Sequence, residues 1–303
     1  MKKTAKVIAF MTAAAMVLST AACASGTGKP ASQAADTTAR ETGTTTAEVA
    51  SQKAEGGDAQ AAAGGHTYKI GVLQLVQHTA LDAANEGFIA ALNDAGIKYE
   101  VDQQNASGDQ STCVTVASKF ANDKKDLILA IATPAAQAVA GAVSDTPILV
   151  TAVTDPAESG LVDTNEKPGG NVTGTSDLTP VKEQIALLQK ILPDAKNIGI
   201  LYCSAESNSE IQASAAREAI EAAGMSSKDF TVSSSNEIQT VVQAMAGKVD
   251  AIYAPTDNTI AAGMSTVSMV ANKNNLPVIC GEAGMVENGG LATYGIDYYQ
   301  LGY

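Results

Sequence analysis

Histidine and cysteine supply most metal ligands and many catalytic groups, and both are sparse in this chain of 303 residues. The sequence has two histidines and four cysteines, and no CxxC, HExxH, GxSxG, Walker-type or GxGxxG pattern lies between a predicted strand and a predicted helix. Carboxylates are numerous, but most lie on predicted helix faces that are exposed to solvent. The sequence therefore predicts no metal site and no cofactor, and a protein that is not an enzyme.

The remaining polar residues gather where predicted strands end. The groups are Gln77-His78-Thr79, Thr133-Pro134, Thr154-Asp155, residues 203–207, residues 255–258 and residues 281–284. Parallel strands place their carboxyl ends on one edge of a sheet, so two facing edges would bring these groups together around a cleft, where ligands of open α/β sheets bind. The alternative for each group is a helix cap, and for His78 a polar loop residue.

Residues 127–156 show the clearest strand–helix–strand pattern. Two short apolar runs, residues 127–132 and 148–153, flank an alanine-rich segment that follows Thr133-Pro134. Such runs are typical of strands buried on both faces of a parallel sheet. A helix that begins at this proline would point free N–H groups outward, so we expect Thr133 and its neighbours to bind a small anion such as a carboxylate. The alternative is that Thr133 is only the helix cap.

The same alternation continues along the chain from about residue 67. Strands are predicted at residues 68–74, 97–103, 127–132, 148–153, 171–175, 197–202, 230–233, 251–254, 277–280 and 291–295. Helices are predicted at residues 79–95, 110–122, 135–143, 179–192, 207–223, 237–246 and 258–272, with a short segment at 282–288. Two consecutive sets of alternating strands and helices predict an α/β protein of two similar lobes with parallel sheets.

The first 66 residues differ from the rest. Residues 1–23 have a basic start, an apolar centre and a small-residue end, Ala21-Ala22-Cys23, which is typical of a secretory signal peptide. The cysteine after two alanines resembles the lipobox of bacterial lipoproteins, although Thr20 stands where that pattern has leucine. We therefore expect lipidation of Cys23, with an ordinary signal peptide as the alternative. Residues 24–66 lack large apolar side chains and are predicted to be a disordered tether.

The net charge is −13, and residues 1–23 hold three lysines and no acidic residue, so the rest of the chain carries −13 − 3 = −16. Such a surface repels phosphates, which predicts that nucleic acid is not a partner and favours a soluble extracytoplasmic domain.

Apart from Cys23, the cysteines are Cys113, Cys203 and Cys280. An odd number cannot pair completely, so they are interpreted as small buried apolar residues.

Several segments resemble a known family: IATPAAQAVA, TAVTDPAESGLV, GGNVTGTSD, YAPTDNTIAAGM and GMVENGGLATYGIDYYQLGY. They are similar to the substrate-binding lipoproteins of ABC transporters, and most of all to the tryptophan/tyrosine-type proteins related to branched-chain amino acid receptors. The resemblance covers residues 67–303. It implies a type I periplasmic-binding-protein fold, with two Rossmann-like lobes, a three-strand hinge and a ligand in the cleft between the lobes.

The resemblance also implies the domain limits. The first lobe would comprise residues 67–175 and 291–303, and the second lobe residues 176–290, with crossings near residues 155–157, 171–176 and 291–296. The family continues beyond this point, so the resemblance implies that Tyr303 is a truncation.

Roles for individual residues follow from the same resemblance. Thr133 and Thr154 would hold an α-carboxylate, and Glu282, with Asp257 next, would receive an α-ammonium. Asp257 has the alternative role of a helix cap, and Ser204 and Ser207 would add hydroxyl contacts. The complete set of expected binding residues is Gln77, His78, Thr133, Pro134, Thr154, Asp155, Ser204, Ser207, Asp257 and Glu282.

These features together predict an extracytoplasmic, lipid-anchored receptor of an ABC importer. It would capture a small molecule, an aromatic or branched amino acid, and deliver it to a permease in the membrane. Two alternatives stay open: a ligand-sensing module for a signalling partner, and a receptor for a neutral solute such as a nucleoside or a sugar.

Overall fold

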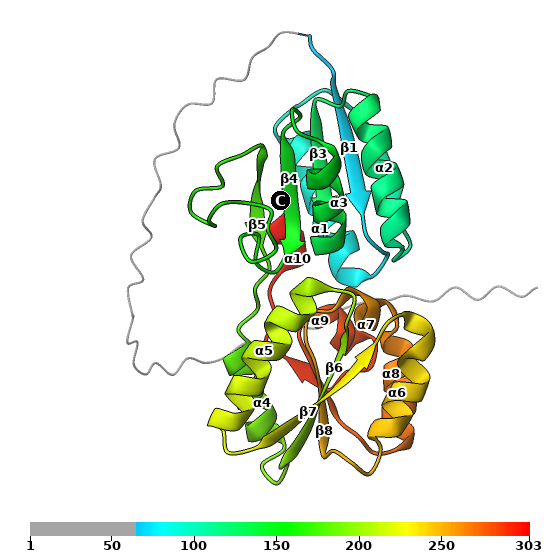
Figure 1. Ribbon diagram of the computed structural model, residues 1–303, viewed down its shortest axis with the longest axis vertical. Helices are drawn as coiled ribbons and strands as arrows, with labels where there is room; N and C mark the ends of the chain where they lie inside the picture. Colours follow the sequence, from blue (N-terminus) through cyan, green and yellow to red (C-terminus); the bar gives the residue numbers. More distant parts are fainter. Residues whose placement is uncertain (1–64) are drawn as a thin grey trace, which may run out of the picture. The chain divides into compact units, whose positions relative to one another are not determined.

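The computed structural model describes residues 65–303, which belong to one compact unit. The expected signal peptide, Cys23 and nearly all of the expected tether lie outside the described residues. The described chain folds into two α/β lobes, each built on a five-stranded parallel sheet (Figure 1). This is the predicted fold class. None of the described helices is long and apolar enough to cross a membrane.

The first sheet has the strand order β2-β1-β3-β4-β5. Its strands are β1 (Tyr68–Gln74), β2 (Tyr99–Asn105), β3 (Leu127–Ile131), β4 (Ile148–Val153) and β5 (Val172–Ser176). The central strands are apolar and buried because helices cover both of their faces. At the ends of β3 and β4, Ala132 and Ala152 adopt φ angles of 80° and 54°, a conformation that alanine rarely takes.

Four helices belong to the first lobe: α1 (Thr79–Asp94), α2 (Gln110–Asn122), α3 (Thr133–Ala142) and α10 (Tyr298–Gly302). Helices α2 and α3 lie side by side on one face of the sheet, and α10 lies against α1 (Figure 1). The contact between α1 and α10 is very close. A Cβ atom on Gly87 would lie 2.0 Å from the carbonyl oxygen of Tyr299, and one on Gly302 would lie 1.9 Å from that of Ala84. Only glycine permits this approach.

The second sheet has the order β10-β9-β8-β6-β7. Its strands are β6 (Asn197–Cys203), β7 (Ser226–Val232), β8 (Ala251–Ala254), β9 (Val278–Cys280) and β10 (Ala292–Thr293). The helices of this lobe are α4 (Val181–Ile191), α5 (Ser207–Ala222), α6 (Ile238–Met245), α7 (Asn258–Ala262), α8 (Met264–Lys273) and α9 (Ala283–Glu287), and a 3-10 turn, η1 (Ser235–Glu237), precedes α6. Two separate apolar clusters form its core, one on each face of the sheet, under α4 and α5 and under α6 and α8.

Two connections between the lobes lie within the described residues, one between β5 and α4 and one between β10 and α10. The crossing expected near residues 155–157 is wrong, because the chain after β4 returns to β5 in the same sheet. The limits expected for residues 291–303 also need correction. Strand β10 pairs with β9 in the second sheet, so the return to the first lobe begins only after Thr293.

Candidate functional site between the lobes

A small cavity lies between the lobes, at the carboxyl ends of their strands. Its volume is about 10 Å³, which is the room of about one water molecule. The lobes are in direct contact around it: a Cβ atom on Gly284 of the second lobe would lie 2.7 Å from Cβ of Thr79 of the first. The lining residues are His78, Leu81, Ala152, Thr154, Asp177, Asn208, Thr256, Asp257, Asn258, Ala261, Glu282 and Tyr298.

Asp177, in the segment that connects β5 to the second lobe, is buried beside the cavity. Its Oδ2 accepts a hydrogen bond of 2.7 Å from the hydroxyl of Tyr298, whereas its Oδ1 is buried and has no partner among the described residues. Burial raises the pKa of Asp177, although the hydrogen bond from Tyr298 and the nearby hydroxyl of Thr154 lower it. A buried carboxylate oxygen without a partner can accept a hydrogen bond from a donor that the protein itself does not supply.

Glu282, at the end of β9, is the second acidic group of the lining and is 3% exposed. Its Oε2 accepts a hydrogen bond of 2.5 Å from the backbone N–H of Gly284 and so caps α9. Burial raises the pKa of Glu282 to about 7, and the negative charges of Glu287 and Asp177 act in the same direction, while backbone hydrogen bonds oppose them. Oε2 of this carboxylate therefore has a structural role. No lysine or arginine in the cavity lining compensates the negative charge of the carboxylate.

Asp257 precedes α7, and both of its carboxylate oxygens are occupied. Oδ1 accepts from the N–H of Ile260 at 2.7 Å, and Oδ2 accepts from the N–H of Cys203 at 2.6 Å and from the hydroxyl of Ser209 at 2.7 Å. Burial raises the pKa of Asp257, and the charge of Glu206 raises it further. These contacts favour the alternative interpretation of Asp257 as a helix cap that also ties β6 and α5 to α7.

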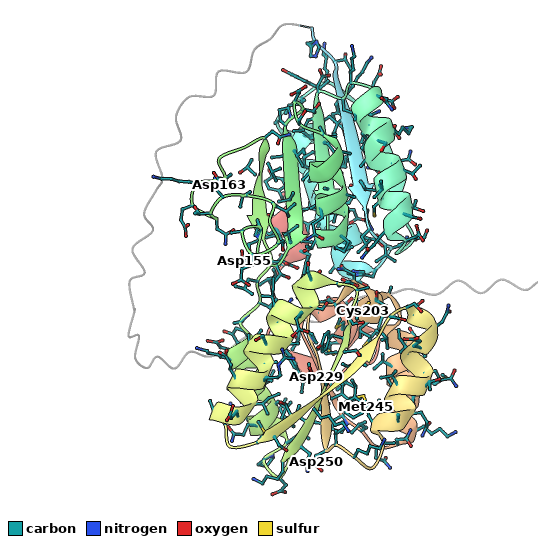
Figure 2. The ribbon with its side chains drawn as sticks, in the orientation of Figure 1. Asp155, Asp163, Cys203, Asp229, Met245 and Asp250 are labelled. Carbon is teal, nitrogen blue, oxygen red and sulfur yellow. The ribbon has the colours of Figure 1, made fainter. Side chains whose placement is uncertain are left out.

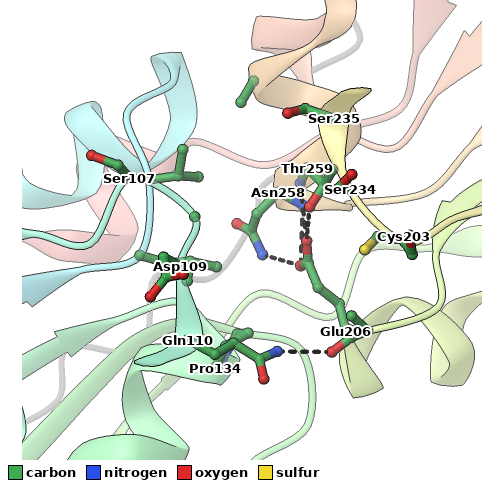
Figure 3. A pocket seen from close by; sticks show the side chains of 16 residues that line it. Ser107, Asp109, Gln110, Pro134, Cys203, Glu206, Ser234, Ser235, Asn258 and Thr259 are labelled. Carbon is green, nitrogen blue, oxygen red and sulfur yellow. Dashed lines mark hydrogen bonds between the residues drawn. The ribbon is translucent and has the colours of Figure 1, made fainter. Parts of the chain in front are cut away.

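Glu206, just before α5, organises the second-lobe side of the cleft. Its carboxylate accepts from the side chain of Asn258 at 2.6 Å, and from the N–H and hydroxyl of Thr259 at 2.9 and 2.8 Å (Figure 3). It also accepts from the side-chain amide of Asn208 at 3.4 Å. Asn258 in turn reaches across the cleft, where its Oδ1 lies 3.3 Å from Nε2 of His78. One buried carboxylate thus fixes the start of α7 and both asparagines that line the small cavity.

Gln212 of α5 forms a second bridge between the lobes. Its Nε2 donates to the hydroxyl of Thr154 in the first lobe at 3.1 Å and also bonds the hydroxyl of Thr256 in the second. Its Oε1 accepts from the hydroxyl of Thr179, in the connecting segment, at 3.3 Å. All four side chains are buried, so these polar contacts are made away from bulk water.

A wider pocket of about 460 Å³ adjoins the small cavity, and Asn258 lines both. Figure 3 shows this pocket: Ser107, Asp109, Gln110 and Pro134 come from the first lobe, and Glu206, Ser234, Ser235 and Thr259 come from the second. The side-chain amide of Gln110 donates to the carbonyl oxygen of Ala205 at 3.0 Å and closes one side of the pocket. Neither cavity has a lysine or arginine in its lining, so the interlobe space is acidic.

The structure brings four of the ten expected binding residues to the small cavity, namely His78, Thr154, Asp257 and Glu282, and it places Pro134 in the wider pocket. Thr133 is buried as the first residue of α3 and lines neither cavity. The helix cap is Ala132, so Thr133 is not the cap residue, and its hydroxyl has no partner among the described residues.

The other four residues lie elsewhere. Gln77 is exposed in a separate hollow along α1. Asp155 holds the turn after β4 by accepting from the N–H groups of Ala157 and Glu158, both at 3.0 Å (Figure 2). Ser204 is exposed and donates to the carbonyl oxygen of Val232, and Ser207 is exposed and accepts from Gln137 at 3.5 Å. In this conformation these four side chains contact solvent or other parts of the protein, and they line neither cavity.

Sequence reasoning did not single out Asp177, Asn208, Glu206 or Tyr298. Asp177 lies two residues after the strand predicted at residues 171–175, close to a strand end as the expected binding residues are, and that position was the available signal. Glu206 and Asn208 fall in or beside the polar group that ends β6, but nothing local distinguishes them from a cap. Tyr298 is buried, and its hydroxyl bonds to Asp177, which is 121 positions away in the sequence. Sequence spacing does not reveal a contact of this kind.

Comparisons with known proteins identify what the chain is similar to. Residues 69–303 match the model of the family described as ABC transporter substrate binding protein. A curated protein of Clostridioides difficile (strain R20291), named tyrosine-binding protein, is 47% identical over 238 residues, which are 77% of this chain and 69% of that protein.

Two crystal structures are also similar. An ABC domain from Streptococcus pneumoniae in complex with L-Trp is 42% identical, with a TM-score of 0.77 over 78% of this chain and 81% of that one. The ligand-free, open structure of a substrate binding protein with adhesive properties from Clostridium difficile is 47% identical, with a TM-score of 0.58 over 78% and 82%. The present structure is therefore closer to the L-Trp complex than to the open structure, although its sequence is closer to the latter.

Proposed function

Because the chain belongs to the family of ABC transporter substrate binding proteins, we propose that its interlobe site captures an aromatic amino acid for delivery to a membrane permease. The family consists of solute-binding receptors, which are not a class of enzymes, and it works outside the cytoplasm. The relatives named for tyrosine and crystallised with L-Trp support the choice of ligand. The observation that carries the proposal is the buried, unpartnered carboxylate oxygen of Asp177.

Asp177 is the residue that we assign to the ligand's α-ammonium. A buried carboxylate is costly unless a positive charge or hydrogen-bond donors compensate it. The cavity lining contains no lysine or arginine that would do so, and it holds Glu282 as a further uncompensated carboxylate. An ammonium group supplies both the charge and the donors, and charge-assisted hydrogen bonds of this kind are the strong ones.

The α-carboxylate of the ligand needs donors, and the first lobe offers them at the tips of its strands. The hydroxyl of Thr133 is buried without a partner, and it stands at the start of α3, where the first N–H groups of a helix have no partner within the helix. Thr133 is therefore proposed to contribute to binding of the α-carboxylate. This role requires the site to widen, because Thr133 lines neither cavity in the present conformation.

An amino acid does not fit into about 10 Å³, so the lobes must separate to admit it and close around it less tightly than they do here. The connecting segments 177–180 and 294–297 are the places where such hinge bending would occur within the described residues. Leu81, Ala152 and Ala261 give the cavity an apolar part for the ligand's side chain.

We expect native mass spectrometry of gently purified protein to reveal a bound amino acid, and calorimetric titration of the ligand-freed protein to show binding of L-tyrosine or L-tryptophan. At a free ligand concentration of about 100 times Kd, the free energy of unfolding should rise by about 2.7 kcal/mol. Binding of a nucleoside or a sugar in place of any amino acid would overturn the proposed ligand class. Binding without uptake by a neighbouring permease would favour the sensing module.

We further propose that Cys23 carries a lipid anchor and that the residues before it are the cleaved signal, which places the receptor on the outer face of the cell membrane. The support is the pattern Ala21-Ala22-Cys23 after an apolar segment. An acyl-modified cysteine at the start of the mature chain would keep the binding domain near its permease.

Cys23→Ser should move the protein from the membrane fraction to the soluble fraction, because the modified sulfur is lost. Cell fractionation followed by immunoblotting measures this, and Cys113→Ser serves as the control because Cys113 is buried in the first lobe. Retention of the Cys23 variant in the membrane fraction would contradict the anchor.

A further inference from the structure

Two asparagines of the cleft have amide groups whose orientation can be assigned from their partners. Glu206 accepts hydrogen bonds from Nδ2 of Asn258 at 2.6 Å and from Nδ2 of Asn208 at 3.4 Å. Nδ2 of Asn208 also faces the carbonyl oxygen of Thr256 at 3.4 Å. The carboxylate of Glu206 also accepts from the N–H of Thr259, so it acts as an acceptor, and in both amides the nitrogen must face Glu206 and the oxygen must point away from it.

The orientation of Asn258 determines the tautomer of His78. Because Oδ1 of Asn258 is an acceptor, Nε2 of His78, 3.3 Å away, must carry the hydrogen. Burial lowers the pKa of His78, although the bond to Asn258 and the charges of Glu206 and Asp82 raise it. The ring is therefore neutral, and its Nδ1 is a bare acceptor. This nitrogen is buried and has no partner among the described residues.

Three residues that line one cavity thus each carry an unpartnered acceptor. The acceptors are Nδ1 of His78, Oδ1 of Asp177 and Oδ1 of Asn208, and each is buried with no hydrogen-bond partner in the described part of the chain. They come from three separate places: the start of α1, the connection after β5 and the first turn of α5. A primary ammonium has three N–H donors and no acceptor, so it is the group that matches this set.

Resting on the proposed function, we propose that these three acceptors form a cradle that selects a primary ammonium and discriminates against ligands whose amino nitrogen is methylated. Each methyl group removes one donor and leaves one buried acceptor unpaired. Glu206 does not touch the ligand. It is a positioning residue that orients Asn208 directly and His78 through Asn258.

The test is calorimetric titration with L-tyrosine, N-methyl-L-tyrosine and N,N-dimethyl-L-tyrosine, which differ only at the amino nitrogen. We expect Kd to rise at least about tenfold for one methyl and about a hundredfold for two, from the cost of an unpaired buried acceptor. If L-tyrosine binds and its N-methyl derivative binds within threefold of it, the cradle is overturned while the proposed function stands. If no amino acid binds, both are overturned.

The variant Glu206→Gln tests whether Glu206 orients the acceptors of the cradle or only supports the folded structure. Its new amide can donate, so the two asparagines lose their fixed orientation, and the ratio of the Kd values for N-methyl-L-tyrosine and L-tyrosine should fall. Glu210→Gln is the matched control: Glu210 lies in the first turn of α5 and bonds Arg217 and Tyr202 instead. An unchanged ratio in Glu206→Gln would show that Glu206 does not position the cradle.

The tautomer of His78 offers a readout that needs no ligand. With only His66 and His78 in the chain, nitrogen NMR of the histidine-labelled protein gives two sets of signals, and His66→Gln assigns them. We expect His78 to carry its hydrogen on Nε2 in the wild type and to lose this preference in Glu206→Gln. A hydrogen on Nδ1 in the wild-type protein would overturn the cradle whatever the titrations give.

Discussion

Asp177→Asn should weaken amino acid binding by roughly 30- to 4,000-fold. The change keeps the size of the side chain and its hydrogen bond to Tyr298, but it removes the negative charge that faces the ligand's ammonium. Loss of one partner of a buried, hydrogen-bonded charge pair costs about 2–5 kcal/mol, and 1.4 kcal/mol corresponds to a factor of ten in Kd. Calorimetric titration with L-tyrosine or L-tryptophan measures the effect.

Two further variants make this result specific. Asp155→Asn changes an aspartate that holds the turn after β4, outside the cavity, so it should leave Kd unchanged. Glu282→Gln tests the assignment made from the sequence. Its carboxylate is already engaged with Gly284, so we expect a smaller loss than for Asp177→Asn. If Glu282→Gln loses binding and Asp177→Asn stays within tenfold of the wild type, the sequence-based assignment is correct and ours is wrong.

The ligand-free protein should become more stable as the pH falls from 8 to 5. The pKa of Glu282 is about 7 in the folded protein against 4.5 for an ordinary glutamate, so over this interval the folded state takes up a proton that the unfolded state does not. Stability linked to a raised pKa is present at low pH and is lost as the pH rises through the folded value. Each pKa unit corresponds to 1.36 kcal/mol, so the Glu282 share is about 3 kcal/mol at most.

Urea unfolding of the ligand-free protein between pH 5 and pH 8 measures this dependence. Glu282→Gln has no proton to gain, so its free energy of unfolding should vary less with pH and should exceed that of the wild type at pH 8. The residual dependence would come from Asp257 and Asp177, whose pKa values burial also raises, and from His78, which opposes them because burial lowers its pKa. Equal pH slopes in the two proteins would exclude Glu282 as a source of the effect.

Local patterns were sufficient to predict most of the fold. Strand β1 and helix α2 have the predicted bounds, because an apolar run and a capping aspartate, Asp109, define them within a few residues. The helix predicted at residues 258–272 is interrupted at Gly263, where a Cβ atom would lie 2.3 Å from the side chain of Ile238. That contact joins distant segments, so no local pattern indicates it.

From the sequence, the site was predictable only as a set of polar residues at the carboxyl ends of parallel strands. A polar residue after a strand has the same local pattern whether it caps a helix, as Asp257 does, or faces a cavity with a free oxygen, as Asp177 does. The difference depends on which atoms the other lobe places nearby. The roles of Glu206 and Asn258 likewise depend on hydrogen bonds between residues 52 positions apart.

Helix α10 has a consequence for the order in which the lobes can be completed during synthesis. It fills a groove on α1 that is shaped by Gly87, and it arrives there only after the chain has passed through the whole second lobe. A nascent chain that contains β1 to β5 therefore lacks the segment that covers this face of α1. Because contacts between segments far apart in sequence form late, a chain emerging from its amino end would carry an unfinished first lobe until residues 298–302 had emerged.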